Sequence, residues 1–264
     1  MRILAQHKKV GIAFIVPGVV SLVFSILKNS STLAFIGLGL TFWGALFFFI
    51  RPERLIHRSL LDSTALSIYA AADRIIRDLK IGSNGYYIPP YPKDAYVPEH
   101  LKGLKETILF ISEEAEKIPP IEEIAQRKFL VKSPRGICIP PPGLGILDQI
   151  EKEIGKDLAS VQLSDLSEIM PQVLIGDLQL AKDIEIDVEE NQVHVTMVNP
   201  AYQSLYTSED LSSVHFLGCP LASAIACAIA KSTGKVVAIQ KIAVSRENQT
   251  FIVKVSYRII EARA

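Results

Sequence analysis

The residues with the clearest chemical potential are Cys219 and His215, in the stretch HFLGCPLASAIACAIAKSTGK at 215–235. Pro220 suits the first position of a helix, where its missing N–H would have had no partner, and Gly234 is a common helix stop. Cys219 would then stand at the helix N-terminus, where the dipole stabilises a thiolate and lowers the pKa of the thiol. His215 could act as its base. This pattern indicates a thiol-dependent enzyme or redox sensor.

The same helix also has a purely structural explanation. Most of its residues are small, and only Leu221, Ile225 and Ile229 are bulky, at a spacing that places them on one face. A helix with small residues on its other faces can pack closely on a sheet and on a neighbouring helix at once. Cys219 and Cys227 would then be small buried residues. We expect this structural role for Cys219 and keep the thiol site as the alternative.

The rest of the sequence offers no competing chemistry. The three cysteines, with Cys138 as the third, lack the paired spacing of a disulfide framework or a zinc knuckle, which favours a reducing compartment. No Ser-His-Asp, paired-carboxylate or metal-ligand pattern stands out, so we predict neither a metal nor a cofactor. Lys plus Arg and Asp plus Glu both number 28, which gives no basic surplus to neutralise phosphates. Nucleic acid is therefore not expected as a partner.

Two apolar runs near the N-terminus predict a transmembrane hairpin. Residues 10–27 and 33–50 carry no charge, and each run has the length of a membrane span. The chain is 49% hydrophobic, with a mean hydropathy of +0.28, although 21% of its residues are charged. An apolar membrane segment joined to an ordinary soluble part explains that combination. A signal peptide is the alternative, but no small-x-small cleavage site follows, and a second run does.

Basic residues predict the orientation of this hairpin. Only Lys28 lies between the runs, whereas the flanks are basic. The membrane-interface candidates are Lys8, Lys9, Arg51, Arg54 and Arg58. Because cytoplasmic flanks are enriched in Lys and Arg, we expect a two-span cell-membrane protein with both termini in the cytoplasm.

Small residues recur every four positions in the second run, at Gly37, Thr41 and Ala45. Such spacing lets helices approach closely. The two spans are expected to pack on each other, and an interface with another membrane subunit is the alternative.

The remaining sequence predicts a juxtamembrane helix at 59–82 and an α+β cytoplasmic domain at 83–264. Residues 82–100, rich in Pro, Tyr and Gly, suggest a loop or an edge strand, since proline cannot sit in a central ladder. Short strands are expected at 107–112 and 128–133, and Pro171 is expected to divide a helix. Alternating hydrophobicity at 183–198 and 235–260 predicts two hairpins on either side of the small-residue helix. This order favours an antiparallel sheet covered by helices.

The segment at 193–259, with its glycine-led small-residue helix followed by GKVVAIQK and a further strand, resembles the C-terminal half of four-vinyl-reductase-like domains, which are related to TRAPP transport subunits. The resemblance implies binding of a small hydrophobic molecule or a role in assembly. It does not extend to that family's later Cys and Gly-x-x-Cys, which IAVSRENQTFIVKV lacks. The whole layout is similar to uncharacterised two-span membrane proteins of archaeal type.

These patterns together favour a non-enzymatic, membrane-anchored cytoplasmic module. Its expected partners are the lipid bilayer and a membrane or cytoplasmic protein, or a second copy in a homo-oligomer. A small ligand is also compatible with the pattern.

Overall fold

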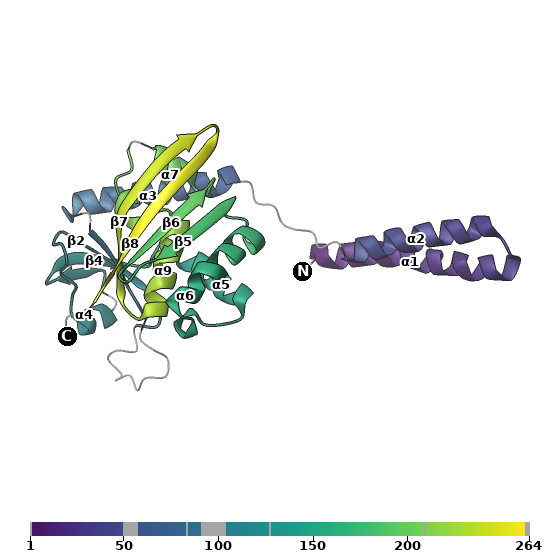
Figure 1. Ribbon diagram of the computed structural model, residues 1–264, viewed down its shortest axis with the longest axis horizontal. Helices are drawn as coiled ribbons and strands as arrows, with labels where there is room; N and C mark the ends of the chain where they lie inside the picture. The colour runs from purple at the N-terminus through teal and green to yellow at the C-terminus, as the bar shows by residue number, and fades with distance from the viewer. Residues whose placement is uncertain are drawn as a thin grey trace. The chain divides into compact units, whose positions relative to one another are not determined.

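The computed structural model of the chain describes residues 2–49, 58–82, 84–90, 104–126, 128–208 and 210–261. Within these ranges, the side chains of residues 2–10, 48–49 and 58 are not described. The chain divides into two compact units, Met1–Ile56 and His57–Ala264. The first is a pair of helices and the second is an α+β body (Figure 1).

The first unit consists of α1 (Arg2–Lys28) and α2 (Ser31–Phe49), which lie side by side (Figure 1). Glycines make their close approach possible. A Cβ added to Gly37 would lie 2.8 Å from Leu22 Cγ, and one added to Gly44 would lie 2.6 Å from Ile15 Cγ1. Any larger residue at Gly37 or Gly44 would therefore push the two helices apart.

The predicted packing residues lie partly in this contact. Gly37 is buried, and Thr41 Oγ1 donates to its carbonyl at 2.6 Å, whereas Ala45 is half-buried. The close contact continues at Gly44, which is also buried and lies seven residues after Gly37. A seven-residue repeat keeps one seam of a helix facing its partner over several turns.

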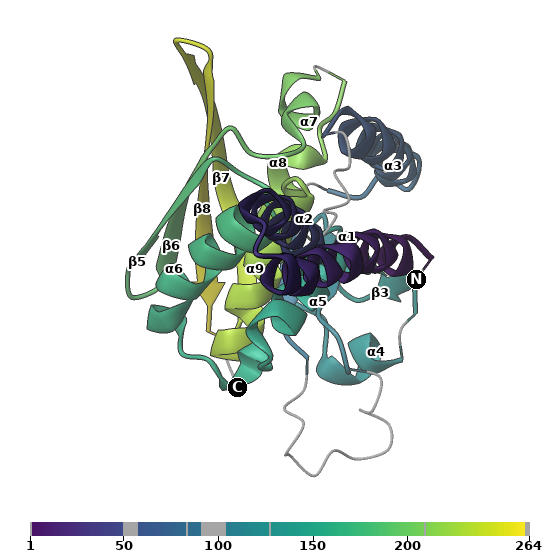
Figure 2. The same ribbon diagram turned by 90° about the vertical axis from the view of Figure 1, so that its right-hand side faces the viewer.

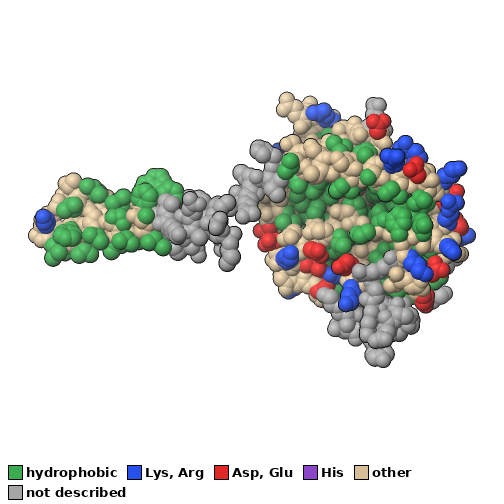
Figure 3. All heavy atoms as spheres, turned by 180° about the vertical axis from the view of Figure 1, so that it is seen from behind, with side chains coloured by type: hydrophobic (Ala, Val, Ile, Leu, Met, Phe, Trp, Pro, Cys, Tyr) green, Lys and Arg blue, Asp and Glu red, His purple; other side chains and the backbone are tan. Residues whose placement is uncertain are grey.

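The rest of the helix pair presents apolar side chains outward (Figure 3). Residues Gly11–Lys28 have a mean hydropathy of 2.1 and are only 11% buried, and Ser31–Phe47 is a shorter apolar helix. A third apolar stretch, Val214–Thr233, has a mean hydropathy of 1.5 but is 83% buried in the second unit. By length and composition alone, α1 and Val214–Thr233 could each cross a membrane. However, the apolar part of α1 is mostly exposed, whereas Val214–Thr233 is mostly buried.

The second unit is built on an eight-stranded antiparallel sheet, in the order β3-β4-β2-β1-β7-β8-β6-β5. This confirms the α+β prediction. The strands are β1 (Asn84–Ile88), β2 (Ile108–Ser112), β3 (Leu130–Lys132), β4 (Arg135–Ile139), β5 (Asp183–Val188), β6 (Gln192–Val198), β7 (Val236–Glu247) and β8 (Thr250–Ile260).

The interpretation of residues 82–100 as a loop or edge strand was wrong for its first part. Strand β1 lies inside the sheet, between β2 and β7. The prolines do not interfere, because the strand ends at Ile88, immediately before Pro89. Residues 91–100 lie outside the described part.

Both predicted hairpins are confirmed. Strands β5 and β6 pair from Asp183–Val198 to Val188–Val193, and β7 pairs with β8 as far as Glu247–Thr250. The β7–β8 turn has Asn248 and Gln249 at φ values of 43° and 72°. Two positive φ values in a two-residue turn are typical of type I′ geometry, whose twist suits paired strands.

Helices cover both faces of the sheet. On one face, α4 (Ile121–Ala125) packs into a smaller core with Tyr86 and Phe110. The larger core lies on the other face and contains α9 (Pro220–Thr233), which contacts β7, β1 and β8 (Figure 2). The other helices are α3 (Arg58–Asp78), α5 (Leu144–Ile154), η2 (Leu158–Ser160), α6 (Leu163–Pro171), the π-helical η3 (Gln172–Asp177), α7 (Gln203–Thr207) and α8 (Val214–Leu217). The expected division at Pro171 is a change of helix type: α6 ends at Pro171 and the chain continues without a break into the π-helical η3.

Helix α9 is enclosed on every side. Ten consecutive residues, Leu221 to Ala230, are buried, because α5, α6 and η2 cover the side that faces away from the sheet. The fit is tight: a Cβ added to Gly143, the N-cap of α5, would lie 2.1 Å from the Ala224 nitrogen. Small side chains on α9 are therefore required by packing.

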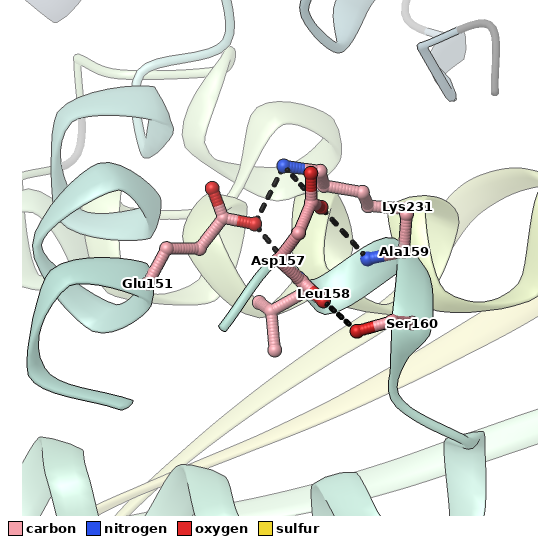
Figure 4. A network of polar contacts seen from close by, with 6 residues as sticks. All are labelled: Glu151, Asp157, Leu158, Ala159, Ser160 and Lys231. Atoms are coloured by element: carbon pink, nitrogen blue, oxygen red, sulfur yellow. Dashed lines mark hydrogen bonds and ion pairs between the residues drawn. The ribbon is translucent and has the colours of Figure 1, made fainter. Parts of the chain in front are cut away.

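A partly buried ion-pair cluster fixes the C-terminal half of α9 (Figure 4). Lys231 Nζ lies 2.5 Å from Glu151 Oε1 on α5 and 3.0 Å from Asp157 Oδ1, and only 12% of the lysine side chain is exposed. Both carboxylates also accept backbone N–H groups, Glu151 from Leu158 and Asp157 from Ala159. The cluster thus ties α9, α5 and η2 together.

We predict that Lys231→Met destabilises the protein by about 2 to 3 kcal/mol, because it leaves two partly buried carboxylates without their cation. Lys235→Met is the matched control, since the Lys235 side chain is itself far more exposed than that of Lys231 and pairs with exposed Glu261, so its effect should be much smaller. Urea unfolding of the two variants checks the difference. Equal losses would contradict the role given to the cluster.

Candidate functional site

The Gly-Cys-Pro segment forms the start of α9 as expected. Gly218, at φ 68°, ends α8, and Cys219 is the N-cap, followed by Pro220 in the first turn. Cys219 Sγ accepts the Ala222 N–H at 3.4 Å. The cysteine therefore takes the capping role that serine or threonine has in many helices.

Tyrosine hydroxyls from four elements surround this N-terminus. Three of them pair with backbone groups at the change from α8 to α9, where helical hydrogen bonds are interrupted, and the fourth adds a donor to a carbonyl within α9. Tyr69 on α3 donates to Gly218 O at 2.6 Å, Tyr87 on β1 donates to Leu217 O, Tyr257 on β8 donates to Ala222 O at 2.9 Å, and Tyr206 on α7 accepts the Cys219 N–H at 3.2 Å.

Helix α3 is fixed to the same region by a buried carboxylate. Asp73 is 5% exposed, and its two oxygens accept the N–H groups of Ser212 and Ser213, each at 2.8 Å. These residues lead into α8, so the negative charge also lies at a helix N-terminus, where it is favourable. Together, Asp73 and Tyr69 dock α3 on the segment that precedes Cys219.

The lowered pKa on which the alternative of a reactive Cys219 depends was wrong. The thiol is 0% exposed, and burial raises its pKa, although hydrogen bonds from Tyr206 and from the Ala222 backbone act in the opposite direction. Burial likewise raises the pKa of Tyr206 well above its ordinary value. Desolvation therefore outweighs the helix N-terminus, and the thiol stays protonated at neutral pH.

His215 does not join Cys219 in a reactive pair. It lies on α8 and is exposed, and no hydrogen bond connects its ring to Cys219 within the described residues. Cys227 is also fully buried, with a raised pKa. Cys138 is half-buried on β4, and burial together with nearby Glu123 raises its pKa to about 11. The described residues contain no cluster of three or more His, Cys, Asp or Glu that could hold a metal ion.

A shallow hollow of about 180 Å³ lies on the surface over β1, β7 and β8. At its edge, Arg258 Nη1 donates to Glu116 Oε1 at 2.8 Å, and the Glu116 N–H donates to Tyr86 Oη at 2.6 Å. Asn84 and Gln240 also line it. The hollow could bind a small polar group, but it contains no nucleophile and base in contact.

Sequence reasoning missed this hollow because its residues come from four separate segments. Tyr86, Glu116, Gln240 and Arg258 share no local motif, and each alone resembles an ordinary surface residue. Only the pairing of Ala238 with both Tyr86 and Arg258 brings β1 and β8 to either side of β7. No signal in a single sequence contains that pairing.

The membrane-interface candidates are not tested by the structure. Arg51 and Arg54 lie outside the described residues, as do the side chains of Lys8, Lys9 and Arg58.

The fold and the site define a class of protein with two parts, an apolar helix pair and an antiparallel α+β domain. Cys219, the cysteine whose sequence context suggested reactivity, is buried in that domain. The chain belongs to the family described as a domain of unknown function (DUF7982), which it matches over residues 3–257. The match covers nearly all of both units. No curated protein and no solved structure matches the chain.

We predict that Cys219 is not alkylated in the folded protein, because its thiol is buried and protonated. The measurement is maleimide labelling at pH 8 of the full chain carrying Cys138→Ala and Cys227→Ala. Labelling should begin only as urea unfolds the protein. Rapid labelling of the folded protein would contradict the burial of Cys219 and restore the enzyme or sensor hypothesis.

Proposed function

We propose that this chain is a membrane-anchored cytoplasmic module that binds a partner or ligand and is not an enzyme. The observation that carries the proposal is the outward apolar surface of α1 and α2. Ile26 is 78% exposed, Phe35 76% and Phe42 63%, on helices that approach each other closely at Gly37 and Gly44.

A bilayer is the environment that suits this surface. Leaving a large apolar side chain in water forgoes about 1.5 to 3 kcal/mol relative to burying it, and the helix pair exposes many such residues. Soluble monomers rarely expose contiguous apolar patches on this scale. Helices also satisfy their own backbone hydrogen bonds, which the hydrocarbon core demands.

The distribution of charge supports a cytoplasmic location for the second unit. Only Lys28 lies in the short connection, and the basic flanks lie at the other ends of the two helices. The positive-inside rule then places the connection outside and both termini inside.

Two observations support binding over catalysis. The one cysteine with a promising sequence context is sealed in the core, and the surface hollow at Arg258 has binding groups without a reactive pair. The passage from α9 directly into β7 and on to β8 agrees with the resemblance of residues 193–259 to four-vinyl-reductase-like and TRAPP-like domains. Those domains bind small hydrophobic molecules or assemble with other proteins, and we propose a similar role here.

Topology can be tested with two matched cysteine variants in a Cys138→Ala background. Ser31→Cys lies at the start of α2 and Ser212→Cys lies on the second unit, and both positions are exposed. A membrane-impermeant maleimide added to intact cells should label Ser31→Cys at once and Ser212→Cys only after permeabilisation. Both proteins should remain in the membrane pellet after carbonate extraction. Release of the chain by carbonate, or the reverse labelling pattern, would refute the proposal.

A further inference from the structure

The outer half of strand β7 has an open edge. The strand spans Val236–Glu247, but β1 pairs with it only at Val237 and Ala238. After an irregularity in the ladder between Ile239 and Lys241, the strand is paired with β8 alone. Among the described residues, no backbone group pairs with the other edge of 241–247. Figures 1 and 2 both show this end of the β7–β8 hairpin extending beyond the neighbouring strands.

This edge has the properties of a pairing surface. An unpaired strand edge offers a row of N–H and C=O groups to another strand, and proteins protect such edges with bulges, prolines and charged side chains. The charges of this segment, Lys241, Arg246 and Glu247, oppose a strand with like charges at the facing positions and favour one with opposite charges. The segment KIAVSRE at 241–247 contains no proline, and its irregularity comes before the open part. Val244, at its centre, is 41% exposed.

We propose that a second copy of this chain pairs with the edge, β7 against β7 in antiparallel fashion, about a two-fold axis through Val244. In isologous pairing of this kind, the residue beside the axis faces the same residue of the other copy. With Val244 on the axis, Lys241 of each copy lies opposite Glu247 of the other. Opposite charges in directly facing positions stabilise a sheet, and like charges destabilise it.

The charge pattern selects this register over its neighbours. A shift of one residue in one direction places Lys241 opposite Arg246, which sets two positive charges against each other. A shift in the other direction places Lys241 opposite Asn248, in the turn, and loses the ion pair. The self-complementary register is therefore a property of these residues, and it specifies a second copy as the occupant.

This inference deepens the proposed function, because it names the partner of an assembly module. It does not depend on membrane insertion. If the dimer test fails while Ser31→Cys and Ser212→Cys label as expected, the anchor stands and the dimer falls.

Disulfide trapping tests the pairing in the full-length protein, purified in detergent with Cys138→Ala. Val244→Cys places two thiols opposite each other across the axis, whereas Ser245→Cys places its thiol opposite Ala243. Both positions are exposed. Under mild oxidation, we expect covalent dimer to form at least tenfold faster with Val244→Cys than with Ser245→Cys. Equal rates, or a Val244→Cys variant that reacts with maleimide as a free thiol and does not cross-link, would overturn the proposal and leave the edge open to a strand from another protein.

Charge exchange provides the second test, in the Val244→Cys protein. Lys241→Glu alone and Glu247→Lys alone should each slow cross-linking severalfold, because each sets like charges against each other. The double variant should restore the original rate, since it re-forms the pair in the opposite sense. All these positions are exposed, so the substitutions should leave the fold intact. Thermal unfolding of each variant checks this. A double variant as slow as the single ones would contradict the proposed register.

Discussion

The fold depends on the burial of most of one helix. Helix α9 lies between the sheet and a layer of α5, α6 and η2, with ten consecutive residues out of contact with water. Complete burial requires small side chains, because both neighbours approach its backbone, as the contact of Gly143 with Ala224 shows. It also requires partners for the polar groups at its ends. Tyrosine hydroxyls provide them at the N-terminus, and the cluster of Lys231, Glu151 and Asp157 holds the C-terminal half.

The same constraint determines the chemistry of Cys219. A thiol at a helix N-terminus is activated when the site is partly exposed, but here the loss of solvation is larger than the stabilisation by the helix. Cys219 caps the helix and fills space. The surface chemistry of the domain lies elsewhere, at the hollow beside Arg258 and along the open edge of β7. Both features are suited to recognition, in agreement with an anchored binding module.

Much of the local structure could be predicted from the sequence. The start of α9 at Pro220, both hairpins and the division at Pro171 follow from local rules of capping, alternation and turn chemistry. The prediction failed where distant segments meet. The central place of β1 depends on pairing with β2 and β7, which no local pattern contains. The pKa of Cys219 depends on burial by elements up to 150 positions away, such as Tyr69 on α3. Candidate residues could be named from the sequence, but their exposure could not.

Hydrogen–deuterium exchange of α9 tests the central claim most directly. In the full-length protein, the amides of residues 224–230 should exchange only through global unfolding, with a free energy equal to that of urea unfolding, because every neighbour of the helix must separate first. The exposed turn residues Asn248 and Gln249 serve as the internal reference for fast exchange. Exchange of the α9 amides well before global unfolding would contradict the account, since the helix would then open without disrupting the core.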